Sequence, residues 1–245
     1  MPVPQRETLT LPSGPTEVLW RRSTRARKIS LRIDPRGGGV IVTLPSRAAQ
    51  AAGMALLREN AAWVADRLAS LPQPILLTDG ATVPIDGLPH CIRRVPNGRR
   101  GAWLEPGSLL VSGAAEFLGR RVADFLRAEA RRRLSALAIA KASAGGLSLR
   151  RVVIKDTRTR WGSCTADQTL MFCWRLVMAP PYVQDYVVAH EVAHLRHMNH
   201  GHGFWTLVAQ LTPNRSLAMH WLDAHGASLM RIGPPGPSRC AATAS

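Results

Sequence analysis

One short segment of the chain carries two histidines and a glutamate at a spacing that could do chemistry. Residues 190–194 read His-Glu-Val-Ala-His. On a helix, positions i and i+4 lie on one face about 6 Å apart, so His190 and His194 could both reach one ion. Glu191 would project beside the pair, close enough to polarise a metal-bound water without binding the metal itself. The segment therefore predicts a metal centre that activates water.

A third ligand is needed, because catalytic zinc takes three protein ligands and leaves one position for water. The run Asn199-His200-Gly201-His202-Gly203 follows soon after, and its glycines allow the backbone to turn back toward the helix. We predict one Zn²⁺ held by His190, His194 and His200, with His202 as the alternative third ligand. His197 would point elsewhere on the helix. Ordinary surface histidines are the other explanation, but scattered surface positions account poorly for five of the eight histidines lying between residues 190 and 202.

The chemistry that follows is hydrolysis. Zinc lowers the pKa of bound water toward about 7, and Glu191 would accept the proton and later pass it to the leaving amine. The second group that stabilises the developing oxyanion is not fixed by the sequence. Arg160, Tyr186 and His220 are candidates, and each could instead be a packing or surface residue.

Strands and helices are expected upstream of this segment. Alternating apolar and polar residues predict a β-hairpin from residues 29–33 and 40–44, with a glycine turn at 37–39, inside a strand region over 17–45. Helical spacing predicts one helix over residues 48–71. Residues 72–112 mix proline, glycine and short apolar runs, which suggests further short strands. A long amphipathic helix is expected over 114–144, ended by Gly145-Gly146.

The elements nearest the motif complete an α+β pattern. Residues 151–156 and 169–177 read as strands, and Pro180-Pro181 ends the second and opens a helix from Pro181 to about Arg196. Val188, Val192 and Leu195 give that helix apolar surface for burial, which a metal helix needs to hold its ligands rigid. Another helix is expected to start near Phe204.

Composition and cysteine usage point to a core-forming protein in a reducing compartment. Hydrophobic residues make up 46% of the 245 residues, and no uninterrupted apolar run approaches the length of a membrane span. The first ten residues lack the apolar stretch of a secretory signal, and the four cysteines form no CxxC pair. We therefore expect a cytoplasmic protein with free thiols and no membrane partner.

The charge balance leaves two interpretations open. The formal net charge is +16, from 32 basic and 16 acidic side chains. Attraction to nucleic acid through a basic surface is one interpretation. A solvated arginine-rich surface is the other, and the spread of the arginines along the chain favours it. The expected helix over 114–144 poses the same choice, and a solvated helix face is again favoured for its arginines: Arg120, Arg121, Arg127, Arg131, Arg132 and Arg133.

Several runs together resemble the YgjP-type metallopeptidase family, a relative of the SprT-like proteases in the zincin superfamily. The resemblance covers about residues 17–225, and a joint match of this kind is highly specific. The runs are Thr159-Arg160-Trp161-Gly162-Ser163-Cys164, Trp174-Arg175-Leu176, Ala179-Pro180-Pro181, Tyr186-Val187-Val188, His190-Glu191-Val192-Ala193-His194, Asn199-His200 and Phe204-Trp205.

The resemblance implies roles for particular residues. Zinc would be bound by His190, His194 and His200, with Glu191 as the catalytic carboxylate. The segment from Arg160 to Cys164 would lie at a sheet edge facing the cleft, where an extended peptide could add as a strand. The other interpretation of that segment is a tight turn between two strands with Trp161 filling the core. One departure is Gly201-His202, where the family usually has a serine after the histidine, and it keeps His202 as a competing ligand.

These observations predict an α+β fold with a β-rich N-terminal region followed by a compact zincin-like domain, whose HExxH helix packs on a small sheet. The expected division is a flexible N-terminus over 1–16, a β-rich region with one helix over 17–112, a zincin-like metallopeptidase domain over 113–232 and a disordered tail over 233–245.

The expected function is zinc-dependent hydrolysis of peptide bonds in a peptide or unfolded protein. Arg160, Trp161, Tyr186 and His202 are candidate contacts with the substrate or transition state. Two alternatives stay open: a SprT-like protease recruited to nucleic acid, and a nucleic-acid-binding module whose zinc is structural. Neither the cleavage preference nor the oligomeric state is indicated.

Overall fold

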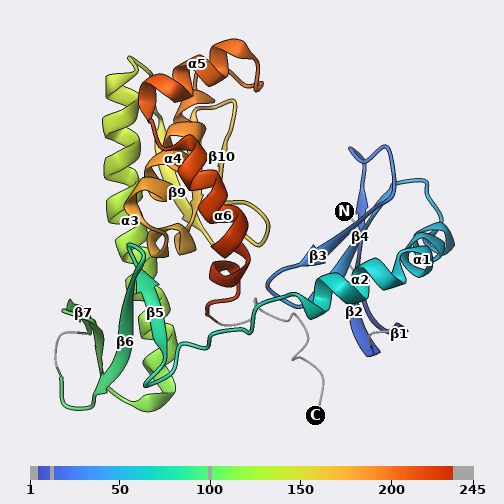
Figure 1. Cartoon of the computed structure of the whole chain (residues 1–245), viewed down its shortest axis with the longest axis horizontal. Coiled ribbons are helices and arrows are strands. Elements are labelled where there is room, and N and C mark those ends of the chain that lie inside the picture. Colours follow the sequence, from blue (N-terminus) through green and yellow to red (C-terminus); the bar gives the residue numbers. More distant parts are fainter. Residues whose placement is uncertain (1–4, 12–13, 99–100, 234–245) are drawn as a thin grey trace. The chain divides into compact units, whose positions relative to one another are not determined.

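The protein is described by a computed structural model over residues 5–11, 14–98 and 101–233 (Figure 1). Within these ranges it has six α-helices and three sheets, so the fold is α+β as predicted. The described residues up to Gln73 form one compact unit and those from Pro74 onward form a second. Each unit has its own cluster of buried apolar side chains. The disordered tail expected over 233–245 lies, beyond Gly233, outside the described residues.

The first unit contains a four-stranded sheet in the order β1-β2-β4-β3. Its strands are β1 (Gln5–Leu11), β2 (Gly14–Ser23), β3 (Ser30–Asp34) and β4 (Gly39–Pro45). The hairpin predicted near residues 29–44 is present as the antiparallel pair β3–β4. β1 pairs antiparallel with β2, so the N-terminal segment expected to be flexible contains an ordered strand instead. Cross-strand pairing with β2 explains why residues 5–11 form an ordered strand. This short run does not by itself predict a strand.

Two helices follow where one was expected over residues 48–71. They are α1 (Gln50–Glu59) and α2 (Ala61–Ala69), separated at Asn60. The Asn60 side chain donates from Nδ2 to the Leu56 carbonyl at 2.8 Å, and its backbone departs from helical geometry with ψ of 17°. An asparagine that bonds the preceding turn competes with the helical backbone, which explains the break.

The second unit begins with another four-stranded sheet, in the order β5-β6-β8-β7. Its strands are β5 (Thr82–Ile85), β6 (Leu88–Val95), β7 (Ala102–Glu105) and β8 (Ser108–Ser112). The sequence grouped these strands with the N-terminal region. They share a core instead with the later helices, because Val83, Ile92 and Leu109 are fully buried in the same cluster as Leu126 and Val188.

The turn between β5 and β6 joins this sheet to the segment before the motif helix. This contact explains why the four strands lie in the second unit, from Pro74 onward, and not in the N-terminal region. Asp86 and Gly87 form this turn with φ of +53° and +78°. Their N–H groups donate to the carbonyls of Val177 and Met178, each at 3.0 Å. A Cβ on Gly87 would lie 2.8 Å from Cγ of Pro180, so both the positive φ and the contact require glycine. The hairpin is thus fastened to the segment that precedes the motif helix.

The long helix α3 (Leu118–Ala144) follows a short 3-10 helix, η1 (Ala115–Phe117). Its predicted apolar stripe is buried, with Val122, Leu126 and Leu134 fully inaccessible. Most of its arginines bond within the protein. Arg121 donates to the Ser112 carbonyl, Arg127 pairs with Asp124, Arg132 and Arg133 pair with Glu129, and Arg133 also pairs with Asp86.

A three-stranded sheet in the order β10-β11-β9 lies beside the motif helix. Its strands are β9 (Arg151–Lys155), β10 (Gly162–Cys164) and β11 (Thr169–Cys173). The strand expected over 169–177 ends at Cys173, and the 3-10 helix η2 (Trp174–Met178) takes the rest. Every η2 side chain is buried, so its apolar run could not be told from a strand by periodicity.

The motif lies on α4 (Pro181–Ala193), which contacts α3, β10 and the two last helices, α5 (His202–Leu211) and α6 (Arg215–Met230). α3 runs along one side of these helices (Figure 1). α4 ends at Ala193, with His194 as its C-cap, somewhat earlier than expected. No helix in the described ranges combines the length and apolar character needed to cross a bilayer.

Candidate metal centre

Three histidines converge at the end of α4. His190 and His194 come from the helix, and His200 comes from the loop that leads to α5. Each offers one ligand atom, and these atoms all lie within 4.8 Å of one another. The ring centroid of His190 is 5.1 Å from those of His194 and His200, and the latter two are 4.7 Å apart. The group could hold a metal ion.

The hydrogen bonds of these rings fit such an ion. Nδ1 of His194 lies 2.9 Å from the His197 carbonyl, which can only accept, so Nδ1 carries the proton and Nε2 keeps a lone pair. Nε2 of His190 and Nε2 of His200 face each other at 3.2 Å. Nδ1 of His190 is buried and has no hydrogen-bond partner among the described residues. His194 thus keeps Nε2 free for a metal, and the close approach of Nε2 of His190 and Nε2 of His200 is compatible with two ligands of the same ion.

The charge state of the histidines also suits metal binding. Burial, followed by the neighbouring His194, His200 and Arg215, lowers the pKa of His190 to about 4. Burial likewise lowers the pKa of His194, against the effect of its bond to the His197 carbonyl. Imidazole binds metals in its neutral form, so these two rings are ready to bind at neutral pH.

Glu191 lies beside the histidines with only 7% of its surface exposed. The backbone of β10 runs directly against it: a Cβ on Gly162 would be 2.5 Å from Cγ and 2.7 Å from Oε1 of Glu191. Burial raises the pKa of Glu191 to about 7, and the nearby Arg160 opposes that rise. A carboxyl group with a pKa near neutrality is suited to accept and return a proton.

The segment from Arg160 to Cys164 has features of both interpretations considered for it, a sheet edge and a turn between strands with Trp161 packed inward. β10 is an edge strand of its sheet, pairing among the described residues only with β11. Trp161 is partly buried and packs against α6, where a Cβ on Gly226 would be 3.4 Å from its Cζ2. The Thr157 hydroxyl donates to the Arg160 carbonyl at 2.6 Å, and the Arg160 side chain is exposed.

Cys164 on β10 is a free thiol, as are Cys91 and Cys173. Burial, followed by the charges of Glu191 and Asp167, raises the pKa of Cys164 to about 11. The thiol therefore stays protonated at neutral pH and is a poor ligand. Cys240 lies outside the described residues.

Aromatic side chains surround the histidines. The Phe204 ring is fully buried and lies 5.0, 4.5 and 4.6 Å from the rings of His190, His194 and His200. Tyr186 packs 6.0 Å from His190. Burial raises the pKa of Tyr186, with the Arg215 charge opposing, so its hydroxyl keeps its proton at neutral pH. These rings hold the imidazoles in place and limit water around them.

Not every candidate from the sequence reaches the cluster. His202 is the exposed first residue of α5 and is not part of the three-histidine group. The His197 ring packs at Gly203, where a Cβ would be 3.0 Å from its Cε1. His220 is exposed on α6.

Arg215 is a residue that sequence reasoning missed. It lies at the start of α6, with its Cζ 3.7 Å from the centroid of the Trp205 ring. Trp205 in turn is 5.7 Å from the ring of His200. No spacing rule links Arg215 to the motif, because the turn between α5 and α6 brings it back to the site.

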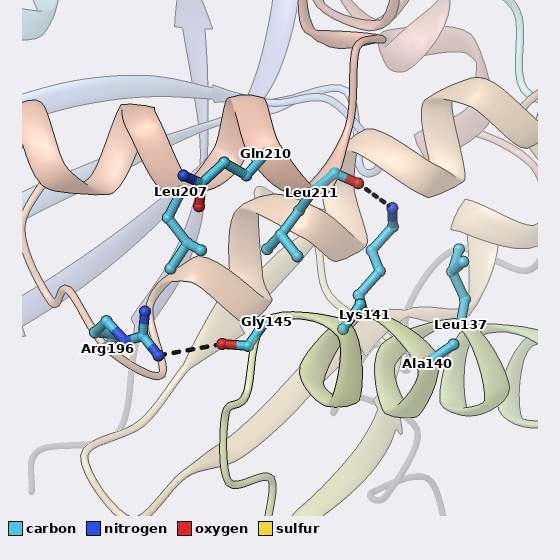
Figure 2. Close-up of a pocket in the computed structure, with 9 residues that line it drawn as sticks. Leu137, Ala140, Lys141, Gly145, Arg196, Leu207, Gln210 and Leu211 are labelled. Carbon is cyan, nitrogen blue, oxygen red and sulfur yellow. Dashed lines mark hydrogen bonds between the residues drawn. The ribbon is translucent and has the colours of Figure 1, made fainter.

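A pocket of about 430 Å³ lies between the end of α3 and α5, apart from the histidines (Figure 2). Its two charged side chains, Lys141 and Arg196, already have partners. Figure 2 shows Lys141 donating to the Leu211 carbonyl, at 2.7 Å, and Arg196 donating to the Gly145 carbonyl, at 3.1 Å. Lys141 also pairs with Asp185 of α4 at 2.6 Å. Both charged side chains of the pocket are thus engaged in contacts within the fold.

A helix-borne histidine pair, a third histidine and a buried carboxylate beside a sheet edge are the features of a metal-dependent hydrolase. Comparison with known proteins agrees, because the model of the YgjP-like metallopeptidase domain matches residues 27–225. The chain belongs to the YgjP-like metallopeptidase family, which confirms the resemblance seen in the sequence and supports a metallopeptidase function.

Two other comparisons add little. No curated protein matches the chain. A solved structure that matches it is the crystal structure of the metallopeptidase zymogen of Pyrococcus abyssi abylysin, at 16% identity and a TM-score of 0.34, with 37% of this chain and 93% of that chain covered.

Proposed function

We propose that the protein is a zinc-dependent peptidase in which His190, His194 and His200 hold one ion and Glu191 is the general base. The observation that carries the proposal is the convergence of three imidazole ligand atoms within 4.8 Å of one another, beside a buried carboxylate. When bound, zinc would polarise the scissile carbonyl and make water acidic enough to react near neutral pH.

The protein's own groups supply the remaining steps. With a pKa of about 7, Glu191 can take a proton onto a carboxylate oxygen and return it to the leaving amine. Compared with the exposed His220, the protonated hydroxyl of Tyr186 is the better placed donor toward a developing oxyanion, because its ring packs against His190. Arg160 lies close enough to Glu191 to act on its pKa and stays a candidate contact with substrate, as does the more remote His202.

The free edge of β10 offers a place for the substrate backbone. Within the described residues β10 pairs on one side only, and its residue Gly162 lies against Glu191. An extended peptide that pairs with this edge would bring its carbonyls past the carboxylate. We therefore propose an extended peptide or unfolded protein as substrate. The cytoplasmic location stays a prediction.

Zinc content and hydrolysis, measured together, test the proposal. We expect one zinc per chain in the wild type and in Glu191→Gln by plasma mass spectrometry, because Glu191 is not a ligand. Hydrolysis of casein or of a peptide library should fall at least about 100-fold in Glu191→Gln. The control His194→Ala should lose both zinc and activity. Zinc-free wild-type protein, or a Glu191→Gln variant that cleaves normally, would refute the proposal.

A further inference from the structure

Arg215 and Trp205 form a stacked pair at the margin of the histidine cluster. The Arg215 guanidinium carbon lies 3.7 Å from the centroid of the Trp205 ring. That ring is 5.9 Å from the ring of His190 and 5.7 Å from the ring of His200. The stacking fixes an exposed, flexible side chain against a ring that lies next to two of the three histidines.

The positive charge of Arg215 has no acidic partner among the described residues. Other arginines do pair: Arg133 with Glu129 and Asp86, and Arg175 with Asp156. Arg215 is also the first residue of α6, where a cation opposes the helix dipole and does not favour the helix. Neither ion pairing nor helix stability therefore accounts for an arginine held at this position.

The stacked pair nevertheless lies at the site. The Trp205 ring contacts the Phe204 ring, with 4.9 Å between centroids, and Phe204 packs against all three histidine rings. A second exposed arginine, Arg160, precedes β10, whose residue Gly162 lies against Glu191. Two separate elements thus bring positive charge toward the groups proposed to do the chemistry.

We propose that Arg215, held on Trp205, binds a carboxylate of the peptide substrate close to the scissile bond. This inference rests on the proposed peptidase function and assigns its substrate class: peptides with an acidic group beside the bond that is cut. A guanidinium stacked on an aromatic face keeps its N–H edge free, and that edge matches a carboxylate with two parallel hydrogen bonds. The carboxylate could belong to an aspartate or glutamate side chain or to the free C-terminus of the substrate.

Matched peptides distinguish these sources. One series carries glutamate or glutamine at each position flanking the cleaved bond, and another carries a free or amidated C-terminus near it. In the wild type we expect kcat/KM about tenfold higher for the charged member of a pair, mainly through KM, since a charge-assisted hydrogen bond of this kind changes affinity by about that factor. The series that shows the preference identifies the source of the carboxylate.

Variants at Arg215 assign the effect to this residue. Arg215→Gln should remove the preference, and Arg215→Lys should retain part of it, because lysine keeps the charge but not the paired geometry. Arg131→Gln is the matched control: it removes the same charge from an exposed position on α3 and should leave the preference intact. An equal loss in Arg131→Gln would assign the effect to net charge and overturn the inference.

Binding to catalytically blocked protein separates this inference from the proposed function. In Glu191→Gln, fluorescence anisotropy of labelled peptides should show about tenfold tighter binding of the charged peptide, lost on adding Arg215→Gln. Peptides that are cleaved and bound equally well with and without the carboxylate would overturn the carboxylate site and leave the peptidase intact. Failure of the wild type to cleave any peptide would overturn the peptidase function itself.

Discussion

At the scale of the residue, the position of Glu191 depends on the absence of a side chain at Gly162. The hypothetical Cβ of Gly162 would lie 2.5 Å from Glu191 Cγ, closer than carbon atoms approach without displacement. The displaced group would be the carboxylate, because it is the neighbour with a free end. The three histidines do not share this contact.

Gly162→Ala should therefore lower kcat by at least about tenfold while zinc content stays at the wild-type level, because a displacement of about 1 Å at a catalytic group can cost 100-fold in rate. Steady-state kinetics and zinc analysis on the same preparation measure both. Gly226→Ala is the control. Its added Cβ would meet Trp161 at 3.4 Å, close to ordinary contact, so activity should persist and the melting temperature should not fall. Loss of zinc in Gly162→Ala would contradict this explanation.

The site residues proposed from the sequence are marked by a spacing within one short segment, whereas the missed residues are not. His190, Glu191 and His194 follow from a spacing within one helix, and His200 from a glycine-bounded return just after it. Arg215 and the contact of Gly162 with Glu191 arise only when separate elements meet. No pattern along the chain encodes such meetings, so the sequence named Arg160, Tyr186 and His220 as candidate partners and passed over Arg215.

At the scale of the element, α4 is anchored through Asp185. This carboxylate accepts from Lys141 of α3 at 2.6 Å, from the Thr212 hydroxyl, and from Asn214 Nδ2 at 3.2 Å. One residue of the motif helix is thus tied to α3 and to the turn between α5 and α6. That turn also positions Arg215.

Asp185→Ala should lower the free energy of unfolding by about 2–3 kcal/mol, because Lys141 would be left largely buried without its counter-ion. Urea unfolding followed by circular dichroism measures the change. Adding Lys141→Met should restore a large part of the stability, since the uncompensated charge is then removed. Asp124→Ala, which breaks the exposed pair with Arg127, should change stability by less than about 1 kcal/mol. Equal effects of Asp185→Ala and Asp124→Ala would show that the network is not what anchors α4.

Element type was more predictable than element limits. The long helix and the hairpin have strong periodicity, and the motif helix is marked by Pro181 at its start and by its histidine spacing, so all three lie within a few residues of their predicted limits. The break at Asn60 and the 3-10 helix after Cys173 were missed, because the first depends on one side chain and the second on burial from all sides. Periodicity carries neither signal.

At the scale of the whole molecule, the strands β5–β8 belong to the same compact unit as the three histidines. Val83, Ile85, Ile92, Leu109 and Val111 are at most 1% exposed and share a core with α3 and α4. Burying side chains of this size stabilises a fold by about 1.5–3 kcal/mol each, so together they match the whole stability of an ordinary domain. Sequence patterns grouped these strands with the N-terminal region, because short strands do not reveal which core they join.

A fragment spanning Pro74–Pro237 should therefore fold and bind zinc, whereas a fragment that starts at residue 113 should not. Loss of β5–β8 exposes the α3 stripe and leaves the Val177 and Met178 carbonyls without their donors. Amide hydrogen exchange and zinc analysis on the two fragments measure the difference. A folded, zinc-binding fragment from residue 113 would show that the strands are dispensable.

The net charge of +16 is not spread over solvated arginines alone. Arg121 and Arg133 of α3 bond to the Ser112 carbonyl, Glu129 and Asp86 within the protein, whereas the sequence favoured a solvated helix face for all six arginines of this helix. Nucleic-acid binding stays a prediction and would be measured as salt-sensitive association near physiological ionic strength.

The hairpin turn at Asp86–Gly87 has a consequence for experiments on distant residues. The N–H groups of this turn donate to the Val177 and Met178 carbonyls, which precede α4. The Asp86 carboxylate also accepts a hydrogen bond from Nε2 of Gln184, near the start of α4, at 2.9 Å. Random mutagenesis scored by zinc retention would thus return substitutions at Gly87 alongside substitutions of the three histidines, although Gly87 is not a proposed ligand. Likewise, transfer of the motif helix into a new scaffold would require this turn, because it holds the start of the helix in place.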